Sequence, residues 1–230
     1  MTNRHFSRGV SLGFPILLGY APVGVAFGVL AVTSGWTPFQ AVLCSATAIA
    51  GAGQFIGLSV VAGGGSLSAA LVATTVVNLR YVLFASTISP YLHGLSPARQ
   101  APLAFTLTDE TFAVNIADRR VGLSTPASML GVGAIAWLGW VAGTALGAYG
   151  AGWVGDPTKW GAQFAMPAMF TALCIALAEN RRHVVIGVVA CTLAVGLAAL
   201  SRGGLRIEAS WLVVVTAMAA ATVGALVFDD

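Results

Sequence analysis

Long apolar stretches without a single charged residue constrain this chain more than any other feature. Three of them reach about 20 residues or more, at residues 9–79, 121–155 and 209–228. A helix needs roughly 20 apolar residues to cross a membrane, so the first stretch alone is long enough for three crossings. Only 8% of the 230 residues are charged, whereas a soluble domain has about a quarter. The sequence therefore predicts an integral membrane protein.

Charged residues, prolines and glycine clusters divide the chain into candidate helices. We expect an all-α polytopic bundle of about 7–8 transmembrane helices, some of them broken or kinked, forming a single permease domain over residues 1–230. The helices are predicted at about residues 10–33, 37–62, 67–90, 102–118, 126–150, 160–179, 184–200 and 209–228. Segment 102–118 is short and polar, so whether it crosses the membrane stays open.

The arginines and lysines between the apolar segments predict the orientation. With eight crossings and a cytoplasmic N-terminus, the inside has six cations and the outside four, including Arg99. If segment 102–118 does not cross, the count becomes five against five. The positive-inside rule therefore favours eight crossings with both ends in the cytoplasm.

Two prolines interrupt the first apolar segment, Pro15 and Pro22. Proline removes a helix hydrogen bond and clashes with the preceding turn, so this helix is predicted to be kinked or broken. A discontinuous helix would expose dipole ends that bind a charged substrate group. An ordinary packing kink is the alternative.

Glycine is abundant, at 28 of 230 residues, and it recurs at four-residue spacing. The recurring positions are Gly24 and Gly28, and then Gly139, Gly143 and Gly147. Small residues at this spacing let helices approach closely, so these positions predict helix packing.

The motif Gly51-Ala52-Gly53-Gln54 places an amide beside flexible backbone within an apolar segment. Gln54 is expected to hydrogen-bond either a substrate or a neighbouring helix. A loose echo, Gly161-Ala162-Gln163-Phe164, is compatible with an internal repeat, as many transporters have.

Arg80 follows Asn78 near the middle of segment 67–90. A guanidinium at that depth is costly unless it is paired or hydrated, and its planar fork matches a carboxylate. We expect Arg80 to hold a substrate carboxylate or to pair with Asp109 or Glu110. The alternative is an interfacial arginine that reaches the lipid headgroups.

Segment 102–118 holds two adjacent acidic residues, Asp109 and Glu110, in an apolar context. At helical spacing they point in different directions, so we expect one to bind a substrate ammonium or a coupling proton while the other pairs with Arg80 or caps a helix. The alternative is a solvated surface loop. A polar stripe is predicted along the same segment, from Thr108, Thr111, Asn115 and Asp118.

Motifs for nucleotide binding, metal-dependent hydrolysis and nucleophilic catalysis are missing from the sequence. We therefore predict a protein that is not an enzyme, with no cofactor, no metal site and no nucleic-acid partner. We predict a site midway across the membrane instead, where substrate binding or coupling falls to ten residues: Pro15, Pro22, Gly51, Gly53, Gln54, Asn78, Arg80, Asp109, Glu110 and Asn115.

Five motifs, in this order along nearly the whole chain, give it a resemblance to a known family. They are residues 15–28, Ala50-Gly51-Ala52-Gly53-Gln54-Phe55, Asn78-Leu79-Arg80-Tyr81, Thr108-Asp109-Glu110-Thr111-Phe112 and residues 164–170. The chain resembles the AzlC family, the large subunits of bacterial two-component exporters of branched-chain amino acids. Its members commonly have histidine where this chain has Tyr81, so a titrating role there would be missing.

The resemblance implies a multi-pass protein of the bacterial plasma (inner) membrane that exports valine, leucine, isoleucine or methionine. It also implies a separately encoded small hydrophobic AzlD-type partner and coupling to protons. A passive channel and a non-transporting scaffold subunit are the alternatives.

Overall fold

The computed structural model describes residues 2–154 and 181–202 continuously, and only scattered positions between 159 and 180 and between 216 and 226. The chain divides into two compact units, Met1–Met169 and Phe170–Asp230. In the second unit the described residues form one long helix, α10 (Arg181–Arg202). All regular elements within the described residues are helices, as predicted. The predicted segments 160–179 and 209–228, and the echo of the glycine motif at Gly161, lie largely outside them.

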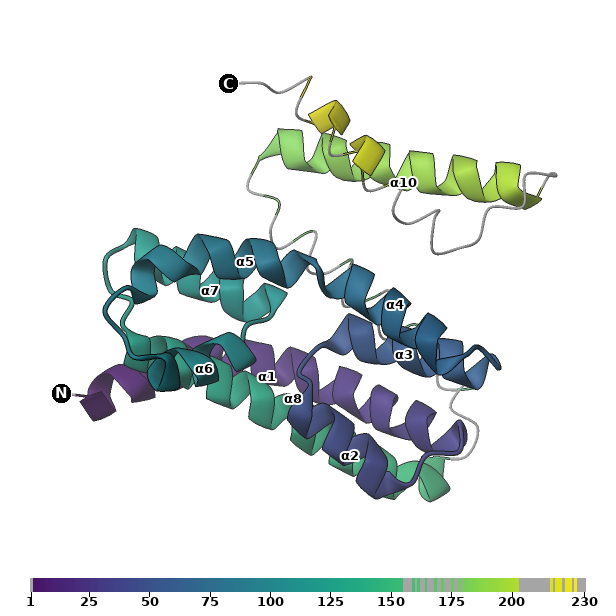
Figure 1. Cartoon of the computed structure of the whole chain (residues 1–230), viewed down its shortest axis with the longest axis horizontal. Helices are drawn as coiled ribbons and strands as arrows, with labels where there is room; N and C mark the ends of the chain where they lie inside the picture. Colours follow the sequence, from purple (N-terminus) through teal and green to yellow (C-terminus); the bar gives the residue numbers. More distant parts are fainter. Residues whose placement is uncertain are drawn as a thin grey trace. The chain divides into compact units, whose positions relative to one another are not determined.

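The first unit holds the other helices whose bounds the structure gives (Figure 1). In chain order they are α1 (Thr2–Thr33), α2 (Pro38–Thr47), α3 (Gly51–Ala62), α4 (Leu67–Asn78), α5 (Arg80–Ile88), the 3-10 helix η1 (Ser89–Leu92), α6 (Pro97–Phe105), α7 (Asp109–Arg120) and α8 (Pro126–Val154). Four candidate membrane spans are long and apolar enough to cross a bilayer within the described parts: Asn3–Thr33, Leu67–Leu92, Pro126–Trp153 and Arg181–Leu200.

Helices α1 and α8 pack side by side and run in the same direction. A Cβ added to Gly9 would lie 2.0 Å from Ser128 O, and one added to Gly28 would lie 2.3 Å from Thr144 O, so contacts advance along both helices together. The predicted glycine spacing is confirmed as a packing device, because no larger side chain fits between these backbones. Shorter helices of the unit pack against this pair.

Helices α2 and α3 form a hairpin. The start of α2 and the end of α3 both lie at the end of the unit where α1 ends. The Gln54 side chain in α3 donates a hydrogen bond to Ser45 Oγ in α2 at 3.0 Å, which shows that the chain has doubled back. Further along α3, Phe55 contacts Phe27 in α1 edge to face, with ring centroids 5.4 Å apart. The hairpin therefore turns at residues 48–50, midway along α1.

Helices α6 and α7 form a second hairpin, which enters from the opposite end. Its turn, residues 106–108, reaches Tyr20 in the middle of α1, where the Tyr20 hydroxyl is 2.8 Å from Thr108 Oγ1. The far end of α7 returns to the start of α1, where Asp118 pairs with Arg8 at 2.5 Å. The two hairpins thus point their turns toward each other (Figure 1).

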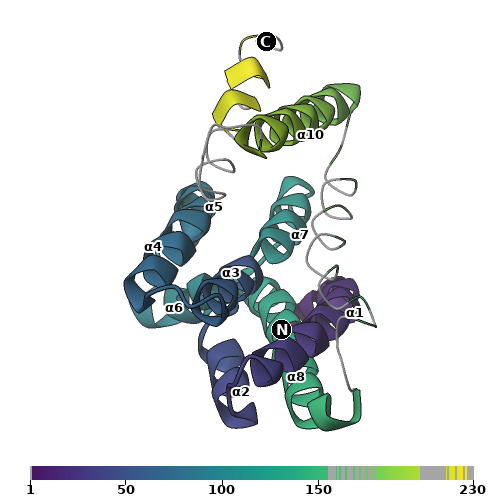
Figure 2. The same ribbon diagram turned by 90° about the vertical axis from the view of Figure 1, so that its right-hand side faces the viewer.

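Helices α4 and α5 follow one another as one interrupted rod (Figure 2). Gly53 in α3 lies against Asn78, and Phe84 in α5 stacks on Phe112 in α7, with centroids 4.5 Å apart. The interruption is at Leu79, a single residue that is not helical. This rod spans the unit from end to end, as predicted for segment 67–90.

Segment 37–62, predicted as a single crossing, and segment 102–118, whose crossing was left open, are each divided between two short helices. Segment 37–62 is divided at residues 48–50, and segment 102–118 begins inside α6 and is divided at residues 106–108. The prediction divided the chain at charges and prolines, and the small uncharged residues Ala48 and Ala50 gave no such signal. Of the six segments predicted within the described parts, four correspond to helices long and apolar enough to cross a membrane.

All arginines of residues 2–154 except Arg80 lie at the end where α1 begins. Arg4 and Arg8 are in its first turns, Arg99 is in the first turn of α6, and Arg119 and Arg120 end α7. Arg99 therefore lies on the same side as Arg4, which corrects the earlier assignment to opposite sides. The opposite loops, residues 34–37 and 63–66, have no charged residue.

Candidate functional site

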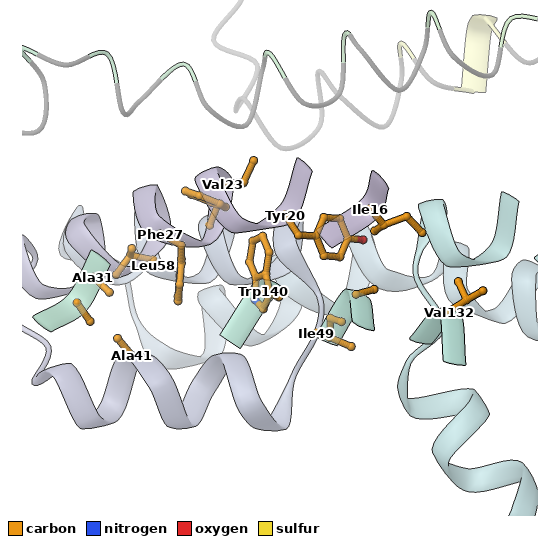
Figure 3. Packing of buried hydrophobic residues seen from close by; sticks show 13 residues of the cluster. Ile16, Tyr20, Val23, Phe27, Ala31, Ala41, Ile49, Leu58, Val132 and Trp140 are labelled. Atoms are coloured by element: carbon orange, nitrogen blue, oxygen red, sulfur yellow. The ribbon is translucent and has the colours of Figure 1, made fainter. Parts of the chain in front are cut away.

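A small cavity lies where the broken elements of the first unit meet. The turn of the α2–α3 hairpin, the start of α7 and the α4–α5 interruption border it, and α1 and α8 close it. Its lining consists of Tyr20, Ile49, Gly51, Ala52, Arg80, Tyr81, Thr108, Asp109, Glu110 and Trp140. Figure 3 shows Tyr20, Ile49 and Trp140 together within the buried core. The site is therefore assembled from five separate stretches of sequence.

The charged groups of the site come from two elements and make two sets of contacts. The Arg80 guanidinium pairs with Asp109 at 3.0 Å. The Tyr20 hydroxyl hydrogen-bonds a Glu110 carboxylate oxygen and also lies 2.8 Å from Thr108 Oγ1. A phenol has one hydrogen, so Tyr20 donates to Glu110 when Thr108 donates to Tyr20. Asp109 is thus paired with an arginine, whereas the contacts shown for Glu110 are with hydroxyl groups and a backbone N–H.

The two helices that begin at this cavity differ in how their N-termini are capped. Thr108 caps α7, accepting a hydrogen bond from the Thr111 backbone N–H in a reciprocal capping box. Helix α3 has no side-chain cap, and its first residue is Gly51. Free N–H groups at a helix start attract anions. The cavity therefore combines acidic side chains on one wall with the start of a helix that has no side-chain cap on another.

The cavity is nearly closed in this conformation. Its volume is about 10 Å³, which is room for a single water molecule. Trp140 fills the space below Gly51: a Cβ added there would lie 3.3 Å from the tip of the indole ring. A ligand of several heavy atoms would require the two hairpin turns to move apart.

Comparison with known proteins assigns the family. The family described as AzlC protein matches residues 15–154, which contain every residue of the cavity. The chain belongs to the AzlC family. This membership confirms the resemblance predicted from the five motifs, and it places the chain in a transporter family rather than an enzyme family.

Three relatives are similar to this AzlC-family protein over more than half of its length. The inner membrane protein YgaZ of Escherichia coli (strain K12) is 32% identical over 79% of this chain and 76% of its own length. An uncharacterized membrane protein of Archaeoglobus fulgidus is 36% identical over 62% of this chain and 61% of its own. The branched-chain amino acid transport protein AzlC of Bacillus subtilis (strain 168) is 26% identical over 70% of this chain and 63% of its own. No solved structure matches the chain.

Four predicted site residues of this AzlC-family chain meet at the cavity: Gly51, Arg80, Asp109 and Glu110. The expected pairing of Arg80 with one carboxylate is found. The two carboxylates have different partners as expected, Arg80 for Asp109 and Tyr20 for Glu110, but they are closer together than expected. Helix α7 begins at Asp109, so both acidic residues lie in its first turn beside the hairpin turn and border the same cavity.

Three further predicted residues lie just behind the cavity wall. Gln54 is buried and accepts a hydrogen bond from Trp140 Nε1 at 2.9 Å, so of the two expected roles it has the helix-linking one. Gly53 packs against Asn78. Asn78 Oδ1 is buried without a hydrogen-bond partner in the described part of the chain.

The remaining three predicted residues lie elsewhere. Helix α1 runs without interruption through Pro15 and Pro22, and both prolines are exposed on its outer side. The prediction of a discontinuous first helix is therefore wrong, and the breaks occur in the neighbouring segments. Asn115 faces a different cavity, described below.

Sequence reasoning missed the aromatic residues of the site, Tyr20 and Trp140. Tyr20 lies between the two prolines and is 7% exposed, and its ring contacts Trp140 edge to face at 5.5 Å. One signal was present, because a tyrosine in the centre of a membrane helix needs a polar partner for its hydroxyl. The sequence did not show which partner.

Proposed function

We propose that this chain is the large subunit of a secondary transporter that exports apolar amino acids such as valine, leucine, isoleucine and methionine. The observation that carries the proposal is the meeting of one guanidinium, two carboxylates and an uncapped helix start midway between the ends of α1. Amino acids are zwitterions, and this cavity offers complementary groups to both charged ends. The Bacillus subtilis relative is named a branched-chain amino acid transport protein, which supports the same substrate class.

Each end of the zwitterion is proposed to bind a different wall of the site. The substrate carboxylate binds the free amides of Gly51 and Ala52, together with Arg80. The substrate ammonium binds Glu110, whose present partners are the hydroxyls of Tyr20 and, through it, Thr108. The rings of Tyr20 and Trp140 and the side chain of Ile49 supply apolar surface for the side chain.

Proton coupling follows from the single carboxylate that binds the ammonium. Glu110 holds either a proton or the substrate ammonium, because a protonated carboxyl has lost the charge that attracts the cation. A site that binds either cation, but not both together, exchanges one for the other. Inward proton flow would then drive outward substrate flow.

Export also requires that the protein has a fixed orientation in the membrane, and the positions of the arginines support one orientation. The positive-inside rule places the end with Arg4, Arg8, Arg99, Arg119 and Arg120 in the cytoplasm. A small hydrophobic AzlD-type subunit is proposed as the partner. The exposed apolar side of α4, with Leu67, Leu71 and Val72, is available to lipid or to such a subunit.

The test is uptake of labelled leucine or methionine into inverted membrane vesicles from cells that co-express the small subunit. We expect an acidic vesicle lumen to drive uptake, and we expect Glu110→Gln to lower the gradient-driven rate by about tenfold or more, the effect of losing a charged contact worth about 1.4 kcal/mol or more. Uptake that ignores the gradient would indicate a channel. No uptake by an inserted complex would indicate a scaffold.

A further inference from the structure

A second cavity, of about 190 Å³, lies between α5, η1, α6, α7 and α8. It is at the arginine-rich end of the unit, since η1 and the start of α6 border it. Its wall is apolar, with Ile88, Leu92, Leu103 and Met129 all buried. Its polar members, Ser89, Gln100 and Asn115, have no charge. This lining offers apolar surface for a side chain and uncharged polar groups beside it, and it has no charged group that would hold a free ion.

Asn115 is an unusual residue in this cavity. It is only 7% exposed, yet its amide makes no side-chain hydrogen bond within the described part of the chain. Its amide atoms are not among the fully buried unpaired atoms of the described residues, so they keep access to the cavity that Asn115 borders. Its neighbours on the same face of α7 are satisfied, since Thr111 bonds Thr106 O at 2.8 Å and Asp118 pairs with Arg8. The amide of Asn115 is therefore available to a ligand in the cavity.

The volume fits a small apolar ligand. An apolar protein cavity of about 150 Å³ holds a benzene molecule, so 190 Å³ accommodates a branched side chain of four carbons with space beside it. The central cavity, by contrast, is nearly closed in the same conformation.

One aromatic pair separates the two cavities. Phe84 and Phe112 stack with centroids 4.5 Å apart at an interplanar angle of 19°. On α5, Phe84 lies between Tyr81 of the central cavity and Ile88 of the second one. On α7, Phe112 lies between Glu110 and Asn115 in the same way. Separation of these two rings would join the cavities.

We propose that the second cavity is a cytoplasmic loading site for apolar amino acids, with Asn115 as its polar anchor and the Phe84–Phe112 pair as the gate to the central site. The inference rests on the proposed function, because it takes its substrate class from there. A molecule entering from the cytoplasm binds first through its apolar side chain and one hydrogen bond to Asn115. It reaches Arg80 and Glu110 when the gate opens.

Thiol protection tests the loading site without relying on transport. Ala104→Cys places a thiol on the cavity wall, in a background with Cys44, Cys174 and Cys191 replaced by Ala, and Ala98→Cys places one on an exposed part of α6 outside the cavity. We expect leucine at roughly ten times its dissociation constant to slow modification at position 104 about tenfold, because only about one site in ten is then empty. Modification at position 98 should not change.

Further variants separate this inference from the proposed function. Protection at position 104 should persist in Arg80→Ala, which disables the central site, and should disappear in Asn115→Leu, which keeps the volume and removes the amide. Intact transport without protection at position 104, or protection that Arg80→Ala abolishes, overturns the loading site alone. Protection in an inserted complex that transports no amino acid overturns the proposed function and retains the cavity as a binding site.

Discussion

At the residue scale, the Arg80–Asp109 pair determines how a charge is tolerated in the middle of this unit. Each partner is mostly buried, with 26% and 16% of the two side chains exposed. Removing one partner of such a pair leaves an uncompensated charge, which costs about 3–5 kcal/mol in buried cases and less where solvent screens the pair. The two residues are therefore expected to depend on each other.

A double-mutant cycle measures this dependence. We expect Arg80→Ala and Asp109→Ala each to lower the free energy of unfolding by about 2–4 kcal/mol, and the double variant to lose less than the sum of the two. Thermal unfolding of the complex in detergent gives the values. Strictly additive losses would show that the two charges do not interact in solution.

Gln54 illustrates a different use of a buried polar group. It receives a hydrogen bond from Trp140 Nε1 at 2.9 Å and donates one to Ser45 Oγ at 3.0 Å. Ser45 in turn lies 2.8 Å from Thr144 Oγ1. The network joins the turn of the α2–α3 hairpin to α8, and all of its members are buried.

Replacing Gln54 should therefore destabilise the hairpin. We predict that Gln54→Leu, which keeps the volume, lowers the free energy of unfolding by about 1–3 kcal/mol, because Trp140 Nε1 loses its acceptor. Trp140→Phe with Gln54→Leu should cost less than the two single changes together. The melting temperature is the measurement, and a substrate-binding role would appear instead as lost transport at unchanged stability.

At the element scale, the contact between α1 and α8 depends on backbones that touch. A Cβ added to Gly147 would lie 2.0 Å from Val25 O, and one added to Gly143 would lie 2.3 Å from Ala21 O. Both carbonyl oxygens belong to the backbone, so neither can move away from an added Cβ as the end of a flexible side chain could. Gly150, on the same helix, has nothing within 4 Å of an added Cβ.

These glycines provide a matched pair of variants. Gly147→Ala should destabilise the unit by about 1–3 kcal/mol, the usual cost of forcing extra volume into a packed contact. Gly150→Ala should be neutral or stabilising by up to about 1 kcal/mol, because alanine favours a helix. Thermal unfolding of the Gly147→Ala and Gly150→Ala variants measures the two effects. Equal effects would mean that α1 and α8 do not approach this closely.

At the scale of the whole molecule, the two hairpins change which loops share a side of the membrane. If segment 37–62 crossed the membrane, the loops at residues 34–37 and 63–66 would face opposite sides. In the structure both loops lie at the end of the unit opposite Arg4 and Arg8. The topology can therefore be tested without any assay of function.

Cysteine labelling distinguishes the two arrangements. With the native cysteines replaced by Ala, Ser34→Cys and Ser66→Cys should react with an impermeant maleimide from the same side, outside the cell. Ser96→Cys, beside α6, should react only from the cytoplasmic side, in inverted vesicles. Labelling of positions 34 and 66 from opposite sides would contradict the hairpin and restore a full crossing.

Much of this molecule could be read from its residues. The membrane class, the spans at α1, α4–α5, α8 and α10, and the glycine contact between α1 and α8 follow from hydropathy and spacing. Those properties belong to a segment itself and need no knowledge of its neighbours. The pairing of Arg80 with an acidic residue was also predictable, because a charge at that depth requires a partner.

Only the tertiary structure decided where the chain turns back and which groups share a cavity. Segment 37–62 is apolar enough to cross, and it turns because Gln54 and Ser45 have their partners on α8, 86 and 99 residues away along the chain. Pro15 and Pro22 do not break α1, since its inner side packs continuously on α8. The roles proposed for Tyr20 and Asn115 depend on neighbouring residues from other helices. Hydropathy fixes which segments enter the membrane, whereas long-range polar contacts fix the paths that they take inside it.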